Sequence, residues 1–575
     1  MCGIVGMTSN EEFSVKQDLL AALKKLEYRG YDSSGVAIKD GTIEKEVGEI
    51  QVLLDKVPSS LTTSTGIAHT RWATHGGVTK KNAHPHITDN ICLVHNGIIE
   101  NYLKLRKDLE EKGYSFKTET DSEVIAIFLE DALKTESPMQ AISKFIQVAK
   151  GTYGVVFFKK NEDILYAFKK DSPLCLGIAP GKLILASDIH AFSNITHKVV
   201  FFEDYDAAII TPDKFEFFNK EGPIDKEVVE LELVETETTK KDFDHYMLKE
   251  IYEQPEASQR LIDSLKSTQK ERANEIADMV RKSKRILFLA CGTSYHAGLI
   301  GSYLLNRLGY ESHAVIASEF EQFSLVDSST LVIVVSQSGE TMDVISVLKS
   351  IKKQNPKLVA IVNTPLSTLH RMSHNYLEML AGKEVCVAAT KSFTNSVICL
   401  YEIARILGNG INLEQIPGKI KQTIEDNEDF VKEISKKLKE KNDIFILGHK
   451  VTYPIAREVA LKLKEISYVH AEGMMAGELK HGTIALVEPG VPVFGLVHES
   501  NKERMESSLQ EVEARGADVY YVGVDSKQFA IPKSSEEEFS LLSTVIGQLL
   551  SYYIALYRKL PIDKPRNLAK SVTVK

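Results

Sequence analysis

The sequence predicts a multidomain α/β protein, and three observations lead to this prediction. The chain has 575 residues, too many for one hydrophobic core. Strand-like and helical runs alternate from Cys2 to about Asp213. Beyond that point a β–loop–α pattern repeats, and its strands are continuous apolar runs, as in parallel sheets covered by helices on both faces. We therefore expect a mixed α/β domain followed by two doubly wound αβα domains.

Composition argues against several classes of partner. With 70 basic and 79 acidic residues, the net charge of -9 provides no polybasic surface for nucleic acid or an anionic membrane. The N-terminus lacks a basic and apolar leader, and no stretch approaches about 18 uninterrupted apolar residues. The six cysteines include no C-x-x-C pair. We therefore expect reduced thiols in the cytoplasm, with no disulfide framework, metal site or cofactor.

The first candidate nucleophile is Cys2, which directly follows the initiator methionine. Removal of Met1 would leave a thiol and a free α-amine on one residue. The amine has an ordinary pKa of about 8, so it can act as the general base for the thiol. This pairing is the nucleophile and base of an N-terminal-nucleophile hydrolase. The alternative is a buried cysteine at the start of a first strand.

Three later stretches offer groups that would bind a free amino acid. Arg71 has the planar fork that matches a carboxylate, with Thr74 and His75 as further donors; alternatively, it forms a surface ion pair beside a core tryptophan, Trp72. The Asn-Gly pair 96–97 favours a hairpin turn and could also form an oxyanion hole, and these two interpretations are compatible. Asp121 is either a helix N-cap or the partner of an α-ammonium group. Together with Cys2, these groups predict hydrolysis of the glutamine amide.

Four motifs resemble, in this order, the glutaminase domain of the class II amidotransferases: Cys2–Gly6, Arg71–Gly76, His95–Gly97 and Asp121. The resemblance implies a four-layer αββα N-terminal-nucleophile sandwich over residues 1–219, followed by a linker at 220–245. It implies catalysis by Cys2, Asn96 and Gly97, and a gate for an ammonia channel at Trp72. The glutamine-binding residues that it implies are Arg71, Trp72, Thr74, His75, Gly97 and Asp121.

In the second half, polar loops follow two apolar strands. Cys291–Ser294 follows the strand at 285–290, and Ser336–Thr341 follows the strand at 330–335. Hydroxyl and backbone N–H donors at a helix N-terminus favour an anion, usually phosphate, although each turn alone could be a capping motif. The chain has no G-x-x-x-x-G-K-[ST] motif, so a nucleoside triphosphate is not indicated.

The strand pattern then returns at 443–448 and 492–497, but His498–Asn501 takes the place of the serine-rich loop. A carboxylate in this loop, that of Glu499, would repel phosphate. We therefore expect one sugar-phosphate pocket for the two copies together. The second copy instead offers reactive side chains. A helix expected to begin with Pro454 at its first position places Glu458, Lys462 and Glu465 on one face, as a catalytic set or as a solvated row of ion pairs.

Two further residues are candidates for chemistry on a sugar. His481 lies in a predicted loop and has an ordinary pKa near neutrality, which suits an acid or base. Lys570 lies in a C-terminal tail whose apolar residues Leu568 and Ala569 would dock it. A docked lysine amine can form a Schiff base with a keto sugar.

The second half resembles the tandem sugar-isomerase (SIS) domains of the amidotransferases that aminate fructose 6-phosphate. The motifs are those at 291–294, 336–341, 461–468, 478–482 and 565–574. The resemblance implies domains at 246–425 and 426–564 with a tail at 565–575, and L-glutamine and fructose 6-phosphate as substrates. The sugar-phosphate contacts that it implies are Thr293, Ser294, Ser336, Gln337, Ser338, Thr341 and, through the backbone, Val387 and Ala569.

The resemblance also assigns roles in catalysis. Glu465 would move a proton between sugar carbons, Lys462 would stabilise charge, and Lys570 would hold the open-chain ketose. His481 of the partner subunit in a homodimer would assist ring opening. The product would be glucosamine 6-phosphate.

Two departures from the family pattern are Thr483, where proline is usual, and residues 449–452, which replace a glycine-containing turn. The short chain also argues against end-product feedback.

Other functions lack their signatures. An asparagine synthetase would need an S-G-G-x-D-S loop for ATP, and a phosphoribosyl amidotransferase would need an acidic motif for its pyrophosphate substrate; neither motif is in the sequence. A non-catalytic sugar-phosphate sensor would have no use for Lys570 and Glu465. The sequence therefore favours an enzyme.

Overall fold

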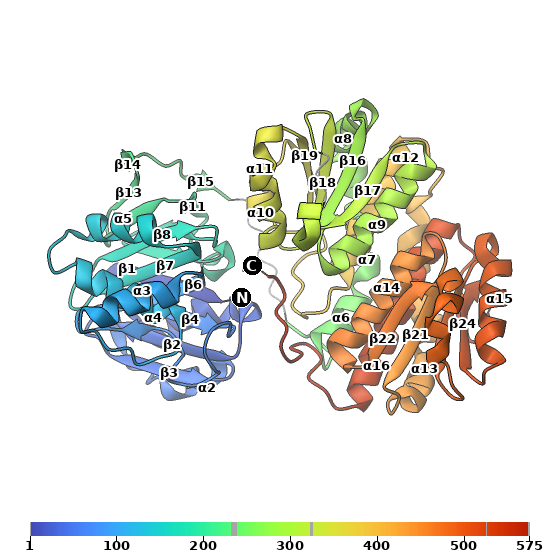
Figure 1. Cartoon of the computed structure of the whole chain (residues 1–575), viewed down its shortest axis with the longest axis horizontal. Helices are drawn as coiled ribbons and strands as arrows, with labels where there is room; N and C mark the ends of the chain where they lie inside the picture. Colours follow the sequence, from blue (N-terminus) through green and yellow to red (C-terminus); the bar gives the residue numbers. More distant parts are fainter. Residues whose placement is uncertain (1, 232–238, 323–325, 525, 573–575) are drawn as a thin grey trace. The chain divides into compact units, whose positions relative to one another are not determined.

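The computed structural model describes residues 2–231, 239–322, 326–524 and 526–572. The chain divides into two compact units, Met1–Glu235 with the last five residues, and Thr236–Lys570 (Figure 1). The predicted linker at 220–245 is partly wrong, because two short strands at 222–224 and 229–230 pair with strands of the first unit. Residues 232–238, which include part of the threonine-rich stretch, lie outside the described residues.

The first unit contains two antiparallel sheets. The eight-stranded sheet has the order β15-β11-β9-β10-β1-β4-β2-β3, and the seven-stranded sheet has the order β14-β13-β12-β8-β7-β6-β5. The strands of the first sheet are β1 Gly3–Ser14, β2 Ser33–Ile38, β3 Ile43–Val47, β4 Thr62–Arg71, β9 Cys175–Ala179, β10 Lys182–Ala186, β11 Lys198–Phe201 and β15 Val229–Glu230. Those of the second are β5 His86–Ile87, β6 Ile91–Ile99, β7 Gly151–Lys159, β8 Leu165–Lys170, β12 Ala207–Ile210, β13 Phe215–Asn219 and β14 Gly222–Ile224.

Helices cover the outer faces of both sheets. The inner faces share a core that includes Ile4, Ile67, Val94 and Val156. The short helices α1 and α2 contact the first sheet, and α4 contacts the second. These layers confirm the predicted αββα sandwich. The helices of this unit are α1 Leu20–Lys24, α2 Ile50–Lys56, α3 Tyr102–Glu111, α4 Asp121–Ala132 and α5 Pro138–Val148.

Two local alternatives considered for this unit are wrong. Asn96 and Gly97 do not form a hairpin turn, because β6 continues through them to Ile99 and pairs with β7. Gly97 has φ +128, and a Cβ there would lie 2.1 Å from the carbonyl oxygen of Thr152. Asp121 is not an N-cap, because it is the first residue of α4 and Thr120 occupies the cap position.

The second unit contains two five-stranded parallel sheets, as predicted. Their orders, β17-β16-β18-β19-β20 and β22-β21-β23-β24-β25, follow the same pattern. In each sheet the strand order reverses between the strands that come first and third in the sequence, β16 and β18 in one sheet and β21 and β23 in the other. Doubly wound sheets bind ligands at such a point. The strands are β16 Arg285–Ala290, β17 Ser312–Ile316, β18 Thr330–Ser336, β19 Lys357–Val362, β20 Asn375–Glu378, β21 Asp443–Gly448, β22 His470–Met475, β23 Pro492–Val497, β24 Asp518–Val524 and β25 Phe529–Ile531.

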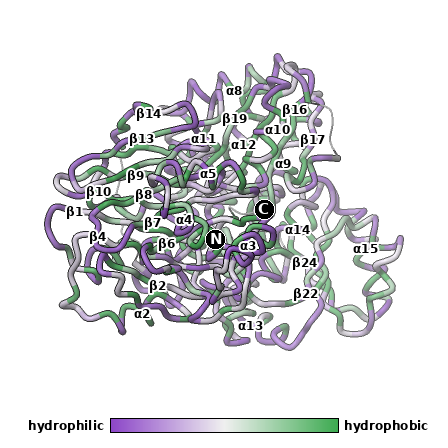
Figure 2. Tube along the Cα trace, turned by 60° about the vertical axis from the view of Figure 1, so that its left-hand side comes forward, coloured by the Kyte–Doolittle hydropathy of each residue, from purple (hydrophilic) through white to green (hydrophobic). Residues whose placement is uncertain are grey.

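Helices lie on both faces of these sheets, and one large core joins them. Figure 2 shows hydrophobic and hydrophilic stretches alternating in surface helices such as α15, which packs against β23. The helices are α6 Tyr246–Tyr252, α7 Gln254–Lys266, α8 Lys270–Lys282, α9 Gly292–Arg307, α10 Met342–Ser350, α11 Thr368–Met372, α12 Lys391–Ile406, α13 Ile416–Leu438, α14 Thr452–Lys462, α15 Lys502–Glu513 and α16 Glu536–Tyr557.

Two helices of this unit bear on earlier expectations. Pro454 is the third residue of α14, not the first, because the helix begins at Thr452; a π-helical turn then continues from Leu463 to Ser467. Among the described residues, α16 is the one helix long and apolar enough to span a membrane, but 94% of that window is buried in the protein.

Close packing of β22 against α14 generates a stability prediction. A Cβ on Gly473 would lie 2.2 Å from the carbonyl oxygen of Ala456, whereas a Cβ on Gly477 would meet nothing within 4 Å. We expect Gly473→Ala to reduce the free energy of unfolding by about 1–3 kcal/mol, because the backbone of α14 must move. Thermal unfolding of both variants tests this, with Gly477→Ala as the control. Equal melting temperatures would contradict it.

Candidate active sites

Cys2 directly precedes β1 and lies beside two of the predicted motifs. Its Sγ accepts a hydrogen bond from the backbone N–H of Trp72 at 3.3 Å. The Asn96 side-chain amide donates to the Cys2 carbonyl oxygen at 2.9 Å. Cys2 is half-buried and precedes the strand, so the alternative of a buried core cysteine is wrong. Burial raises the pKa of the thiol, which means that a nearby base must generate the thiolate.

Arg71 holds the loop that follows it. Its guanidinium donates to the carbonyl oxygens of His75, Gly76 and Gly77 at 2.5, 3.1 and 3.2 Å. The residue is 3% exposed, which rules out the alternative of a surface ion pair. Burial lowers the pKa of Arg71, and the charges of Cys2, Asp32 and Asp121 act against this shift. These four groups therefore lie in one electrostatic environment.

The remaining predicted glutamine contacts surround this loop. Trp72 and His75 are partly buried and Thr74 is exposed, so Trp72 is not a core tryptophan. Asp121 is buried, and its carboxylate accepts the backbone N–H of Ile99 at 2.8 Å. Asp32, which the sequence analysis did not single out, accepts the N–H of Ala73 at 2.8 Å. Asp32 lies in a Gly- and Ser-rich loop with no distinctive local signal.

His69 is a second residue that the sequence analysis left without a role. Burial lowers its pKa to about 3, so the ring is neutral. Its Nε2 lies 3.1 Å from two acceptors, the His95 carbonyl oxygen and Asn96 Oδ1. Because both partners accept, Nε2 must carry the proton. This hydrogen bond fixes the orientation of the Asn96 amide and directs its Nδ2 donor toward Cys2.

In the second unit, Glu458, Lys462 and Glu465 form a network in which Glu465 is partly exposed and the other two side chains are buried. Lys462 Nζ lies 2.5 Å from Glu465 Oε2 and 3.4 Å from Glu458 Oε1. The side chains of Glu458 and Lys462 are 0% and 1% exposed, so the alternative of a solvated row is wrong. His296, which sequence reasoning missed, lies on α9 and pairs with Glu458 at 2.7 Å. His296 comes three residues after Thr293 and so lies on the same face of α9. This spacing could have identified it from the sequence.

The electrostatics of this network suit proton transfer. Burial lowers the pKa of Lys462, but the two carboxylates outweigh burial and raise it above its ordinary value. Burial raises the pKa of Glu465, against the charges of Lys462 and Lys570. A carboxyl group whose pKa is raised is a stronger base than an ordinary carboxylate, which favours proton transfer.

The predicted phosphate loops follow β16 and β18, on either side of the point where the strand order reverses. Ser336 Oγ and Thr341 Oγ1 are 3.0 Å apart, and Ser336 Oγ accepts the Gly339 N–H at 3.0 Å. Ser294 lies at the start of α9, as expected. However, the hydroxyl of Thr293 donates to Glu458 at 3.0 Å and accepts from Lys462 at 3.1 Å. Thr293 thus joins the predicted phosphate loop to the network of Glu458 and Lys462.

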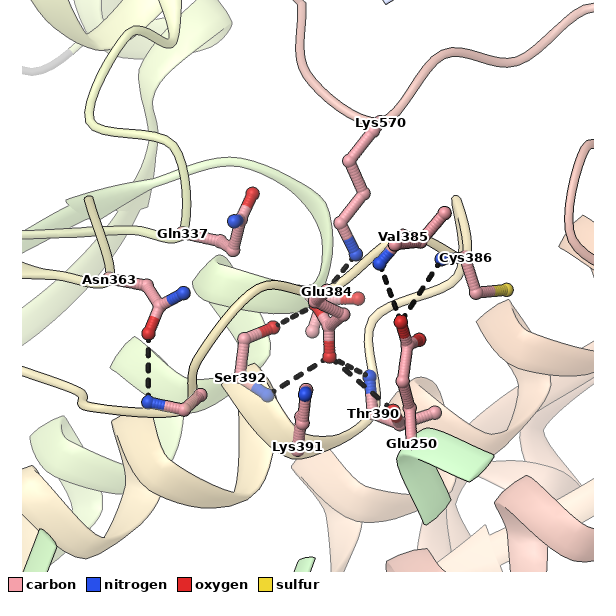
Figure 3. A network of polar contacts seen from close by, with 12 residues as sticks. Glu250, Gln337, Asn363, Glu384, Val385, Cys386, Thr390, Lys391, Ser392 and Lys570 are labelled. Carbon is pink, nitrogen blue, oxygen red and sulfur yellow. Dashed lines mark hydrogen bonds and ion pairs between the residues drawn. The ribbon is translucent and has the colours of Figure 1, made fainter. Parts of the chain in front are cut away.

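The tail places Lys570 in the interior of the second unit. Its Nζ lies 2.6 Å from Glu384 Oε2, and both side chains are buried, at 3% and 0% exposure (Figure 3). Figure 3 also shows Gln337, which lies on the loop that follows β18. Ala569 is half-buried, and the N–H of Val387 donates to the Asp563 carbonyl oxygen at 3.1 Å. No sequence pattern indicated Glu384, which lies in the loop before α12.

His481 is not brought to this network within the described protomer. It is exposed at the end of a 3₁₀ turn, Ala476–His481, and not in an irregular loop as predicted. The second-copy loop does lie where expected, because Glu499–Asn501 follows β23 and His498 caps it. Thr483 begins a further 3₁₀ turn, Thr483–Leu486.

Comparison with known proteins supports this division of roles. A glutamine amidotransferase domain model matches residues 69–194, and a SIS domain model matches 279–404 and 437–556. Glutamine–fructose-6-phosphate aminotransferases (isomerizing) from Methanosarcina acetivorans and Aquifex aeolicus are both 40% identical over 100% of each chain. The solved C-terminal domain of glucosamine-fructose-6-phosphate aminotransferase from Francisella tularensis is 32% identical, with a TM-score of 0.53 over 57% of this chain and 100% of that chain.

A solved glucosamine-6-phosphate deaminase from Thermotoga maritima is 27% identical, with a TM-score of 0.50 over 58% of this chain and 100% of that chain. Fold and sites thus define a glutamine amidotransferase joined to a tandem SIS unit. Given 40% identity over the full length of both chains, the chain belongs to the family of glutamine–fructose-6-phosphate aminotransferases (isomerizing).

The contact between His69 and Asn96 generates a kinetic prediction. We expect His69→Phe, which keeps a buried ring but removes the donor, to reduce kcat for glutamine hydrolysis by about 10²-fold without changing KM, because the Asn96 amide, the expected oxyanion donor, loses its orientation. Steady-state glutaminase assays measure this. His197→Phe, at an exposed histidine, is the control. A wild-type kcat in His69→Phe would show that Asn96 needs no such support.

Proposed function

We propose that this enzyme releases ammonia from glutamine at Cys2 and uses it to convert fructose 6-phosphate to glucosamine 6-phosphate. The family, the glutaminase fold and the tandem SIS fold support this reaction. The observation that carries it is the pair of buried lysines, Lys570 and Lys462, with the partly exposed Glu465 beside Lys462, in the same unit as the polar loops after β16 and β18. A sensor that only binds sugar phosphate would not need two buried lysines and a proton-transferring carboxyl group.

In the first half-reaction, the free α-amine of Cys2 accepts the thiol proton after Met1 is removed. The thiolate attacks the glutamine amide, and the Asn96 amide and Gly97 N–H stabilise the oxyanion. Arg71, Trp72, Thr74, His75 and Asp121 position the amino acid. Ammonia leaves, and water hydrolyses the thioester to glutamate. Trp72 gates the passage of ammonia to the sugar.

In the second half-reaction, the serine- and threonine-rich loops bind the phosphate group through Ser294, Ser336, Gln337, Ser338 and Thr341. The Lys570 amine forms a Schiff base with C2 of the open-chain ketose, and ammonia then replaces the lysine. Glu465 takes a proton from C1 and returns it to C2, which gives the aldose. Lys462 stabilises the negative charge that develops between these two steps.

The predicted domain division is retained, with the glutaminase domain extended to include β14 and β15. We place the enzyme in the cytoplasm as a homodimer. In this dimer, His481 of the partner subunit assists ring opening, which fits the exposure of His481 on its own protomer.

The direct test is formation of glucosamine 6-phosphate from fructose 6-phosphate and glutamine, without ATP or added metal. We expect Cys2→Ala to lose glutaminase and glutamine-dependent synthase activity. We expect Lys570→Ala to lose synthase activity but retain glutaminase activity, because the two residues serve different half-reactions. A wild-type enzyme that hydrolyses glutamine but forms no amino sugar would refute the proposal.

Mixed dimers test the assignment of His481. Each site would take Lys570 from one chain and His481 from the other. A mixed dimer of His481→Ala and Lys570→Ala would therefore contain one site in which both residues are intact. With random pairing about half of the dimers are mixed, and one of the two sites in each mixed dimer is intact, so the mixture should have about one quarter of wild-type activity. Glu465→Gln mixed with Lys570→Ala is the matched control, because these two residues belong to the same chain. Absence of recovery in the first mixture would place His481 outside the partner's site.

A further inference from the structure

Glu384 binds the amine of Lys570 and is held from several other directions. Its Oε1 accepts the backbone N–H groups of Thr390 and Ser392 at 2.9 and 3.1 Å. Its Oε2 accepts the Ser392 hydroxyl at 2.5 Å and Lys570 Nζ at 2.6 Å. The carboxylate therefore caps the N-terminus of α12 and pairs with the lysine at the same time (Figure 3).

These contacts keep Glu384 ionised although it is fully buried. Burial alone raises the pKa of Glu384, but Lys570, Ser392 and the Thr390 N–H together lower it to about 2. A second buried carboxyl group, Glu250 of α6, accepts the N–H of Val385 at 2.5 Å. Burial and the Glu384 charge raise the pKa of Glu250 to about 8, so it is mainly protonated at neutral pH.

The other charged groups around this pair are already matched. Lys391 pairs with Glu253 at 2.7 Å, and Glu253 also pairs with Lys249 at 3.1 Å. Glu465 pairs with Lys462. Glu384 is thus the anionic group in direct contact with the Lys570 amine among the described residues.

Resting on the proposed Schiff base, we propose that Glu384 accepts the proton that Lys570 loses when its amine attacks the sugar carbonyl, and later returns that proton to the departing hydroxyl. The ammonium first transfers one proton to Glu384. The amine lone pair forms the C–N bond at C2, and the carbonyl π electrons move to oxygen, which takes a second proton from nitrogen. Protonated Glu384 then donates to this hydroxyl, which leaves as water as the C=N bond forms.

The balance of these steps explains why a group that is ionised before and after the reaction suits the site. The ammonium and the carbonyl become a protonated Schiff base and water, so one positive charge is present at nitrogen both before and after the step. The same carboxylate compensates that charge in both states, and no proton has to cross the buried site from solvent.

The experiment measures formation of the Schiff base directly. Enzyme is mixed with fructose 6-phosphate and cyanoborohydride, and the reduced adduct on the Lys570 peptide is followed over time by mass spectrometry. We expect Glu384→Gln, which keeps the size of the side chain, to slow adduct formation by about 10²-fold, because the general base is lost. Glutaminase activity and thermal unfolding of the same sample should match those of wild type; the first shows that the glutaminase unit is folded and the second that the unit carrying Glu384 is folded.

Two further variants make the outcome decisive. Glu402→Gln is the matched control, because Glu402 is also a buried carboxylate on α12, paired with Arg405 at 2.6 Å; it should form the adduct at the wild-type rate. Glu384→Ala leaves space for a small carboxylate, so added formate should raise its rate of adduct formation. A purely structural role would not respond to formate.

Each result decides between two hypotheses. Adduct formation at the wild-type rate in Glu384→Gln, or no response of Glu384→Ala to formate, would overturn the role of Glu384. Absence of any Lys570 adduct in wild type would instead overturn the Schiff base of the proposed function.

Discussion

Compensation of buried charge is the constraint on which the second unit depends. Glu458, Lys462, Glu384 and Lys570 have side chains that are almost fully inaccessible to solvent. An isolated ion in such a place would cost many kcal/mol, so each one is stable only beside its partner. This requirement explains why the tail enters the interior at Lys570, and why α9 and α14 meet at His296 and Glu458.

The same constraint links substrate binding to chemistry. Thr293 belongs to a predicted phosphate loop, but its hydroxyl contacts both Glu458 and Lys462. Under the proposed function, movement of α9 on binding a phosphate would therefore alter the contacts of Glu458 and Lys462. In the first unit, the neutral ring of His69 has a comparable function, because it sets the direction of an amide donor without introducing a charge.

The sequence was sufficient for much of this arrangement, for identifiable physical reasons. The apolar strands at 285–290 and 443–448 could only belong to covered parallel sheets, and the spacing of Glu458, Lys462 and Glu465 defines one helix face. Local pattern failed where long-range pairing overrides it. One of the two interpretations of Asn96 and Gly97 was a hairpin turn, yet pairing with β7 carries the strand through them. Glu384 and Asp32 act through contacts with segments distant in the sequence, which no spacing rule reveals.

The two parallel sheets share one strand order, but the polar loop after the third strand of each has diverged. One copy retains hydroxyl groups there, while the other presents His498 and Glu499 and contributes α14. Corresponding positions of the two copies thus present different side chains. Under the proposed function, hydroxyl groups of one copy hold the phosphate and the helical segment of the other carries the proton-transferring carboxyl group. A substitution that changes the ligand held by the first loop therefore need not touch Glu465.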